Sequence, residues 1–153
     1  MPLQEYLVVV FLSLLPVSEL RGGIIYGLAH GLEPVSLFVV AVTVNEIAGL
    51  LVLSALNNLL PFFLKIALLE KFYNYSVLRA RKQYEPQIKK YGSIGLVLFI
   101  AVPLPGTGSW TGALAAFLLG MHYKKFAIVN LIGVVIAGMI VTLAGLGAIE
   151  LFF

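Results

Sequence analysis

The sequence predicts an all-α integral membrane protein built as an inverted repeat. Each half is a re-entrant helical hairpin followed by a transmembrane helix, and a cytoplasmic amphipathic linker helix joins the halves. Composition, two Pro/Gly-rich interruptions and the charge distribution predict this fold. The 153 residues are 61% hydrophobic and 11% charged, with a mean hydropathy of +1.04, which is far more apolar than a soluble domain. The chain is then one membrane domain, with repeat 1 at about 1–60, a basic linker at about 61–92 and repeat 2 at about 93–153.

An offset of 89 residues aligns the two halves without a gap. The matched residues are prolines, glycines and one tripeptide: Pro16 with Pro105, Gly23 with Gly112, Gly31 with Gly120, and Ile47-Ala48-Gly49 with Ile136-Ala137-Gly138. Matches of these types at one offset indicate an internal duplication. The alternative is coincidence in an apolar chain that has 15 glycines.

Each half begins with two short apolar arms on either side of a break. The first arms are Tyr6–Leu15 and Ser93–Val102, and the second arms are Gly23–Gly31 and Gly112–Gly120. At about 1.5 Å per residue, an arm of about ten residues reaches half of the hydrocarbon core, so two arms can form a hairpin that enters and leaves by one face. Such a hairpin requires that its tip is buried in protein or lines a cavity. The segments that follow, Val35–Leu60 and Lys125–Phe152, are long enough to cross the bilayer.

The basic residues predict the orientation. Seven of the ten lie in 61–92, and Lys124 and Lys125 are two more. With re-entrant hairpins all nine share one face, which the positive-inside bias places in the cytoplasm, and both termini lie outside. If all four apolar segments crossed, Lys124 and Lys125 would lie opposite the linker, so we favour the re-entrant topology. The linker has the pattern of a helix on the membrane surface, broken near Pro86.

The first break has the sequence PVSELRGG, residues 16–23. Pro16 has no N–H group and is expected to stop the first arm. Gly22 and Gly23 are expected to allow the tight reversal and a close approach of backbones. These three residues are therefore predicted to shape the hairpin tip.

The charges at this break have two interpretations. Structurally, Ser18 and Glu19 would cap the returning arm, and Arg21 would pair with Glu19 or with exposed carbonyl groups. Functionally, ionisable groups at mid-depth are expensive and usually line a substrate or ion path. We therefore treat Glu19 and Arg21 as candidate ligands of a substrate or ion.

Glu46 adds a further carboxyl group near the middle of the first full crossing, beside Asn45. With Glu19, Arg21 and Glu46 all ionised, the membrane interior would carry one excess negative charge. One carboxyl is then expected to be protonated, or to hold a cationic substrate or ion. This pattern suggests proton coupling, and the alternative is a Glu46 that is permanently neutral or faces a partner helix.

The second break, PLPGTGSWTGA at 103–113, carries no charge. Its prolines and glycines are predicted to shape the tip: Pro103, Pro105, Gly106, Gly108 and Gly112. Its polar and aromatic side chains are candidate substrate ligands: Thr107, Ser109, Thr111 and Trp110. Trp110 would either line a pocket or pack in the core, and the backbone N–H groups of the following arm would suit a carboxylate or another anion. Asn130 in the last crossing is a weaker candidate.

The composition argues against several classes of protein. There is no cysteine, no aspartate and no P-loop or hydrolase signature, and the two histidines, His30 and His122, are isolated. We therefore expect no enzyme activity, no metal, no cofactor and no nucleic-acid partner.

The two break motifs carry a family resemblance. PVSELRGGIIYGLAHG and PLPGTGSWTGALAAFLLGM resemble the motifs of the putative small multidrug export proteins, short bacterial and archaeal membrane proteins, and the match covers nearly the whole chain. Ile25 stands where the first motif usually has a proline. The residues that match the family signature are Glu19, Arg21, Gly22 and Gly23 in the first motif, and Pro105, Thr107, Gly108, Trp110, Thr111 and Gly112 in the second. More distantly, the chain resembles the DedA/VTT superfamily of lipid-moving proteins with two inverted re-entrant hairpins, although its second hairpin lacks that family's arginines.

The resemblance and the residues together predict a small secondary transporter of the prokaryotic plasma membrane. We expect proton coupling and a small amphiphilic or lipid-like substrate, which would pass a midplane site between the hairpin tips of a homodimer surrounded by membrane lipid. One alternative is a DedA-like flippase or scramblase of phospholipid or polyprenyl phosphate. A second alternative is a membrane scaffold that transports nothing.

Overall fold

The computed structural model describes residues 2–63, 65, 71, 74–75, 79–104 and 106–152, and this part of the chain is helical without a strand. The helices in chain order are α1 (Pro2–Leu14), α2 (Glu19–Ala29), α3 (Pro34–Phe63), α5 (Arg79–Ala101), α6 (Ser109–Leu118) and α7 (Tyr123–Phe152). The all-helical prediction is confirmed at this level.

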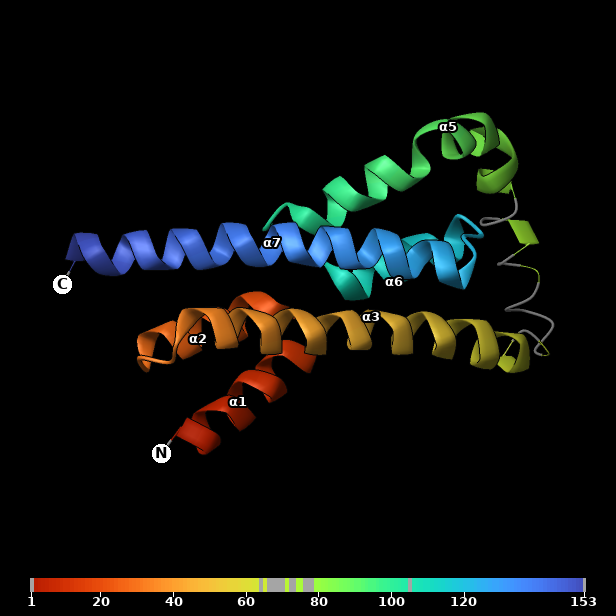
Figure 1. Ribbon diagram of the computed structural model, residues 1–153. Coiled ribbons are helices and arrows are strands. Elements are labelled where there is room, and N and C mark those ends of the chain that lie inside the picture. Colours follow the sequence, from red (N-terminus) through yellow and green to blue (C-terminus); the bar gives the residue numbers. More distant parts are fainter. Residues whose placement is uncertain are drawn as a thin grey trace.

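Two helices, α3 and α7, are long and apolar enough to cross a membrane. The candidate spans are Pro34–Leu59 and Tyr123–Leu151 within the described residues. Figure 1 shows α3 and α7 as antiparallel rods that lie side by side, with both chain termini at one end and the end of α3 and the start of α5 at the other. Both spans are the segments that the hydropathy predicted, with slightly different bounds.

The other helices have shorter apolar stretches, and they form two helical hairpins, α1 with α2 and α5 with α6. In Figure 1, α1 runs from the end that holds the termini to the middle of the rods, and α2 returns to that end. From the opposite end, α5 runs to the middle and α6 returns, so the two breaks meet near the centre. The short apolar stretches are Leu3–Leu14, Lys90–Ala101 and Ser109–Leu118.

The helix ends recur at a spacing of 89 residues. The first residue of α7, Tyr123, follows the first residue of α3, Pro34, by 89 positions, and the last residue of α6, Leu118, follows the last residue of α2, Ala29, by 89 positions. Gly31 after α2 and Gly120 after α6 both have positive φ angles, of 70° and 65°. Each is followed by the same backbone bond of a Schellman turn, from Leu32 to the Gly27 carbonyl and from Met121 to the Ala116 carbonyl.

Several local predictions about the breaks were wrong. Helices α2 and α6 begin earlier than expected, so Gly22 and Gly23 lie inside α2, and Gly112 lies inside α6. In these helices the glycines allow tight packing instead of a reversal. A Cβ at Gly23 would overlap Ser13 of α1, and one at Gly112 would crowd Ile100 of α5.

The prediction for the linker was wrong at Pro86, and much of the rest of it concerns residues that the structure does not describe. Helix α5 begins at Arg79 and continues through Pro86, where a break was expected. A proline removes one backbone hydrogen bond, which bends a helix without ending it when the bonds on either side hold. Much of the predicted surface helix, including 66–70 and 76–78, lies outside the described residues.

Side chains at equivalent positions cap the two long helices. Glu33 accepts the Val35 N–H at 2.9 Å and the Ser36 N–H at 2.6 Å at the start of α3. At the start of α7, the His122 ring nitrogen Nδ1 accepts the Lys124 N–H at 3.3 Å. His122 is 89 positions after Glu33, so the residue that caps α7 and the residue that caps α3 occupy equivalent positions.

The Glu33 cap should make the stability of the protein depend on pH. The hydrogen bonds from the Ser36 backbone, the Ser36 side chain and the Val35 backbone lower the pKa of Glu33 below its ordinary value of 4.5. A lowered pKa means that this stabilisation is present above the ordinary pKa and is lost as the pH falls through the lowered one. Glu33→Ala should therefore lower the thermal unfolding temperature at pH 7, and the difference from wild type should disappear below the ordinary glutamate range.

Thermal unfolding of the detergent-solubilised protein across a pH series measures this effect. Glu150→Ala is the matched control, because Glu150 is an exposed carboxyl near the end of α7. A Glu33→Ala deficit that is the same at every pH would show that the cap does not act through its charge.

Candidate functional site

The two helix breaks contact each other through Arg21. Its Nη1 donates to the carbonyl oxygens of Leu104 at 2.9 Å and Thr107 at 2.8 Å. Its Nη2 lies 3.1 Å from the carbonyl oxygen of Val102 and 3.2 Å from the Thr107 hydroxyl. Arg21 therefore binds carbonyl groups that follow α5, more than 80 residues later in the chain.

Glu19 binds the other side of the second break. Its carboxylate accepts the Trp110 N–H at 3.1 Å, and its side chain is only 3% exposed. Trp110 is the second residue of α6, and the residue that precedes this helix is Gly108, which has no side chain to cap it. Glu19 thus caps α6 from the first hairpin.

This pairing explains why one break is charged and the other is not. The second break is a helix C-terminus followed by a helix N-terminus, which carry partial negative and partial positive charge respectively. Arg21 meets the carbonyl end and Glu19 meets the N–H end. Both charged side chains of the first break therefore form hydrogen bonds with the backbone of the second break.

The expected cap on α2 is absent, which corrects the sequence interpretation. Ser18 makes no side-chain capping bond to α2, and its hydroxyl donates to the Leu12 carbonyl oxygen at 2.6 Å instead. Glu19 is the first residue of α2 and has a φ of 50°, and its carboxylate binds the N-terminus of α6. The structural interpretation of Glu19 as a helix cap was right, but the helix that it caps is α6 and not α2.

The contact between Glu19 and the second break requires a glycine at position 108. Its φ of 138° is a conformation that disfavours side chains, and an added Cβ would overlap the Glu19 carboxylate. The tips of the two hairpins can therefore approach this closely only because residue 108 is a glycine.

A buried polar chain lies between the two spans. The Ser109 hydroxyl on α6 lies 3.0 Å from Asn130 Oδ1 on α7, and Asn130 Nδ2 donates to Glu46 Oε2 on α3 at 2.7 Å. Asn45, next to Glu46, donates to the Ser13 carbonyl oxygen of α1 at 3.1 Å. Four helices are joined by these bonds, and Ser109, Asn130 and Asn45 are fully buried.

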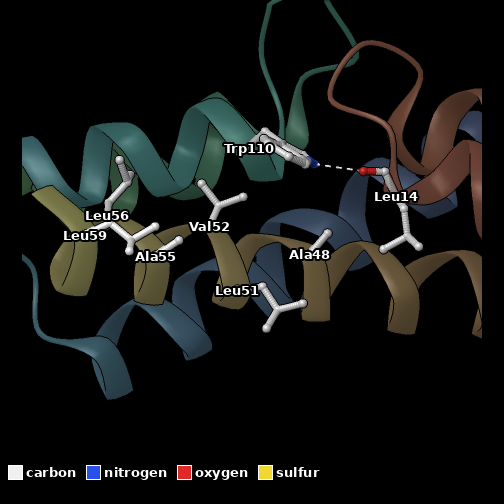
Figure 2. A pocket seen from close by; sticks show the side chains of 8 residues that line it. All are labelled: Leu14, Ala48, Leu51, Val52, Ala55, Leu56, Leu59 and Trp110. Atoms are coloured by element: carbon white, nitrogen blue, oxygen red, sulfur yellow. Dashed lines mark hydrogen bonds between the residues drawn. The ribbon is translucent and has the colours of Figure 1, made fainter.

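Trp110 lies at the boundary between this polar centre and an apolar cavity. Its indole N–H donates to the carbonyl oxygen of Leu14, the last residue of α1 in the first hairpin, at 3.1 Å (Figure 2). The cavity has a volume of about 530 Å³ and is lined by Leu14, Ala48, Leu51, Val52, Ala55, Leu56, Leu59 and Trp110. Of the two interpretations of Trp110, the geometry places it in the wall of this cavity.

Most of the predicted candidates gather at this centre, although not all point toward a ligand. The Thr107 hydroxyl holds its own break, 2.7 Å from the Val102 carbonyl oxygen. Thr111 bonds only weakly to the Gly108 carbonyl oxygen at 3.4 Å. The tip residues Pro16, Pro103 and Gly106 lie in the non-helical breaks, and Pro105 lies outside the described residues.

The sequence interpretation missed Ser13 and undervalued Asn130. Both are fully buried polar residues within apolar stretches of their helices. A polar side chain in the middle of an apolar run is itself the available signal. In the described part of the chain, no group of three or more His, Cys, Asp or Glu side chains could hold a metal ion.

Comparison with protein families identifies a match that covers most of the chain. A family model described as "Putative small multi-drug export protein" matches residues 19–140. Those residues contain Glu19, Arg21, Glu46, the whole second break and most of α7. The comparisons with curated proteins and with solved structures give no match.

Proposed function

Because the chain belongs to this small multi-drug export family, we propose that it is a proton-coupled secondary transporter of a small amphiphilic substrate. The family description supports transport in general. The observation that carries the proposal is the meeting of two broken helical hairpins at a polar centre between two candidate spans. Broken helices that meet at the midplane form the binding sites of many secondary transporters.

In the proposed membrane arrangement, α3 and α7 cross the bilayer and the two hairpins enter from opposite faces. Helices α1, α2 and α6 have 13, 11 and 10 residues, which is about half of a crossing. The recurrence of helix ends at a spacing of 89 supports an inverted repeat. Lys124 and Lys125 lie at the end of α7 that adjoins the linker side, so the positive-inside bias places that side in the cytoplasm.

The contacts divide the charged residues into two roles. Glu19 and Arg21 hold the hairpin tips together, since each is bound to backbone groups of the second break. Glu46 is only half-buried, and its carboxylate is bonded to the neutral side chain of Asn130. We therefore assign Glu46 as the group that gains and loses the coupled proton, and the cavity beside Trp110 as the substrate site.

A homodimer belongs to the same proposal. Two crossings and two hairpins offer little area to shield a polar centre from lipid, and a second copy would complete that shield. Crosslinking in native-like membranes tests this point independently of transport.

The transport assignment is tested in proteoliposomes with a pH gradient. The probe is a dansyl-labelled quaternary ammonium amphiphile, and a membrane-impermeant quencher reports transfer of its head group between leaflets. Wild type should show transfer that depends on the pH gradient, and Glu46→Gln should reduce it to the level of empty liposomes. Glu150→Gln, which changes an exposed carboxyl near the end of α7, should leave it unchanged.

The same vesicles separate the alternative functions. Normal gradient-dependent transfer by Glu46→Gln would contradict the proton-carrying role. Transfer of an NBD-labelled phospholipid by wild type without a gradient would favour a flippase or scramblase. A folded wild type that moves neither probe would favour a scaffold.

A further inference from the structure

A second apolar cavity lies on the other side of the hairpin tips. It has a volume of about 500 Å³ and is lined by Ile25, Leu28, Ala29, Pro103, Ile140, Val141, Ala144, Gly145, Ala148 and Ile149. We call it the α7 cavity, and the cavity beside Trp110 the α3 cavity, after the long helix that contributes most of each lining. Both volumes lie in the usual range of small-molecule sites.

The two cavities occupy equivalent positions in the two halves. Six positions of the α7 cavity are positions of the α3 cavity shifted by 89: 14 and 103, 51 and 140, 52 and 141, 55 and 144, 56 and 145, 59 and 148. The side chains differ at most of these pairs, for example Leu56 against Gly145. The hollow therefore follows from the shared arrangement of the backbone, and a chance gap between particular side chains would not recur in this way.

Each cavity begins at the hairpin tips and runs toward a different end of the molecule. The α3 cavity starts at the contact of Trp110 with Leu14 and follows α3 toward the linker end (Figure 2). The α7 cavity starts at Pro103, beside the Val102 carbonyl that Arg21 binds, and follows α7 toward the C-terminus. Between positions 48 and 59, α3 rises by about 17 Å, which is close to half of the hydrocarbon thickness.

We propose that each cavity holds one alkyl chain of a single-chain amphiphile, with the polar end toward the hairpin tips. This inference rests on the proposed function and specifies its substrate class. Apart from the indole of Trp110, whose N–H is already bonded to Leu14, the linings are apolar. A peptide segment there would leave backbone polar groups without partners, whereas an alkyl chain has none to satisfy. The two cavities then serve as the entry and exit positions, one in each leaflet.

Trp110 allows a direct test, because it is the only tryptophan and lies in the wall of the α3 cavity. The protein is placed in nanodiscs of unbrominated lipid, and a dodecyltrimethylammonium probe brominated near the end of its chain is added. We expect quenching of Trp110 fluorescence that saturates with the mole fraction of probe and is reversed by the unbrominated homologue. Both measurements are made without a pH gradient.

Cavity-filling variants provide the matched controls. Ala55→Phe fills the α3 cavity from an exposed position and should weaken the saturable quenching of Trp110 at least several-fold. Val39→Phe adds similar bulk at an exposed position of α3 outside both cavities and should not. A second reporter for the α7 cavity combines Trp110→Phe with Ile149→Trp, so that its only tryptophan lies in the wall of that cavity. Adding Ala144→Phe to this reporter should weaken its saturable quenching, as Ala55→Phe does in the α3 cavity.

The outcomes decide between occupants and separate the two proposals. Quenching that rises linearly with probe, or that Ala55→Phe does not change, would overturn the inference, since ordinary contact with lipid would explain it. Loss of saturable quenching on dimerisation would assign the cavity to a second copy of the chain and also overturn it. Saturable quenching without gradient-dependent transport would retain the cavities and reject the proposed function, and transport without saturable quenching would do the reverse.

Discussion

Gly108→Ala is expected to separate the two helix breaks and to destabilise the folded protein strongly. The new Cβ would overlap the Glu19 carboxylate, and the φ of 138° would be strained in any residue with a side chain. Strain of this kind and the loss of a helix cap together amount to about 2–4 kcal/mol. The measurement is the midpoint of unfolding in detergent by heat or by a denaturing detergent, with helix content as the signal.

Two other glycines separate the causes of this effect. Gly106 also has a positive φ, of 81°, but nothing lies within 4 Å of a Cβ placed there. Gly106→Ala therefore measures backbone strain alone. Gly95 in α5 has open space and an ordinary φ, so Gly95→Ala should be neutral or slightly stabilising. If Gly108→Ala is no worse than Gly106→Ala, the contact with Glu19 contributes nothing to stability.

Arg21→Ala is the second change with a large expected effect. It would leave the carbonyl groups of Val102, Leu104 and Thr107 without the donor that they share. Hydrogen bonds from a charged donor contribute about 1.5–3 kcal/mol each, and they are not additive, so we expect a loss on the order of 3 kcal/mol. The unfolding midpoint in detergent, measured as for Gly108→Ala, should therefore fall relative to wild type.

Arg21→Lys is the informative control for this prediction. Lysine keeps the positive charge but lacks the planar fork that serves several acceptors at once. An intermediate midpoint would show that both charge and geometry matter. An Arg21→Ala protein that is as stable as wild type would contradict the role assigned to Arg21.

The sequence was informative wherever the determining signal was local. Apolar length predicted both candidate spans, and Pro16 and Pro103 marked the ends of the first arms within a few residues. The bounds of α2 were less accurate, because Gly22 and Gly23 are weak helix formers, and only the structure shows Gly23 packed against α1.

The contacts of the candidate site could not be predicted in the same way. Arg21 and Glu19 bind backbone carbonyl and N–H groups, which every residue has, so no side-chain pattern identifies the partner. Sequence reasoning therefore placed the Glu19 cap on its own helix, the nearest one available. Asn130 was ranked low because its importance comes from Ser109 and Glu46, which lie on two other helices.

The contact of the first break with the second has a consequence for biosynthesis. The backbone groups that bind Arg21 and Glu19 are 81 to 91 residues further along the chain. At 5–20 residues per second, the ribosome needs roughly 5–20 s to add them. During that interval the backbone groups that bind Arg21 and Glu19 have not yet been made, so the contact between the hairpin tips can form only after the second break has been translated.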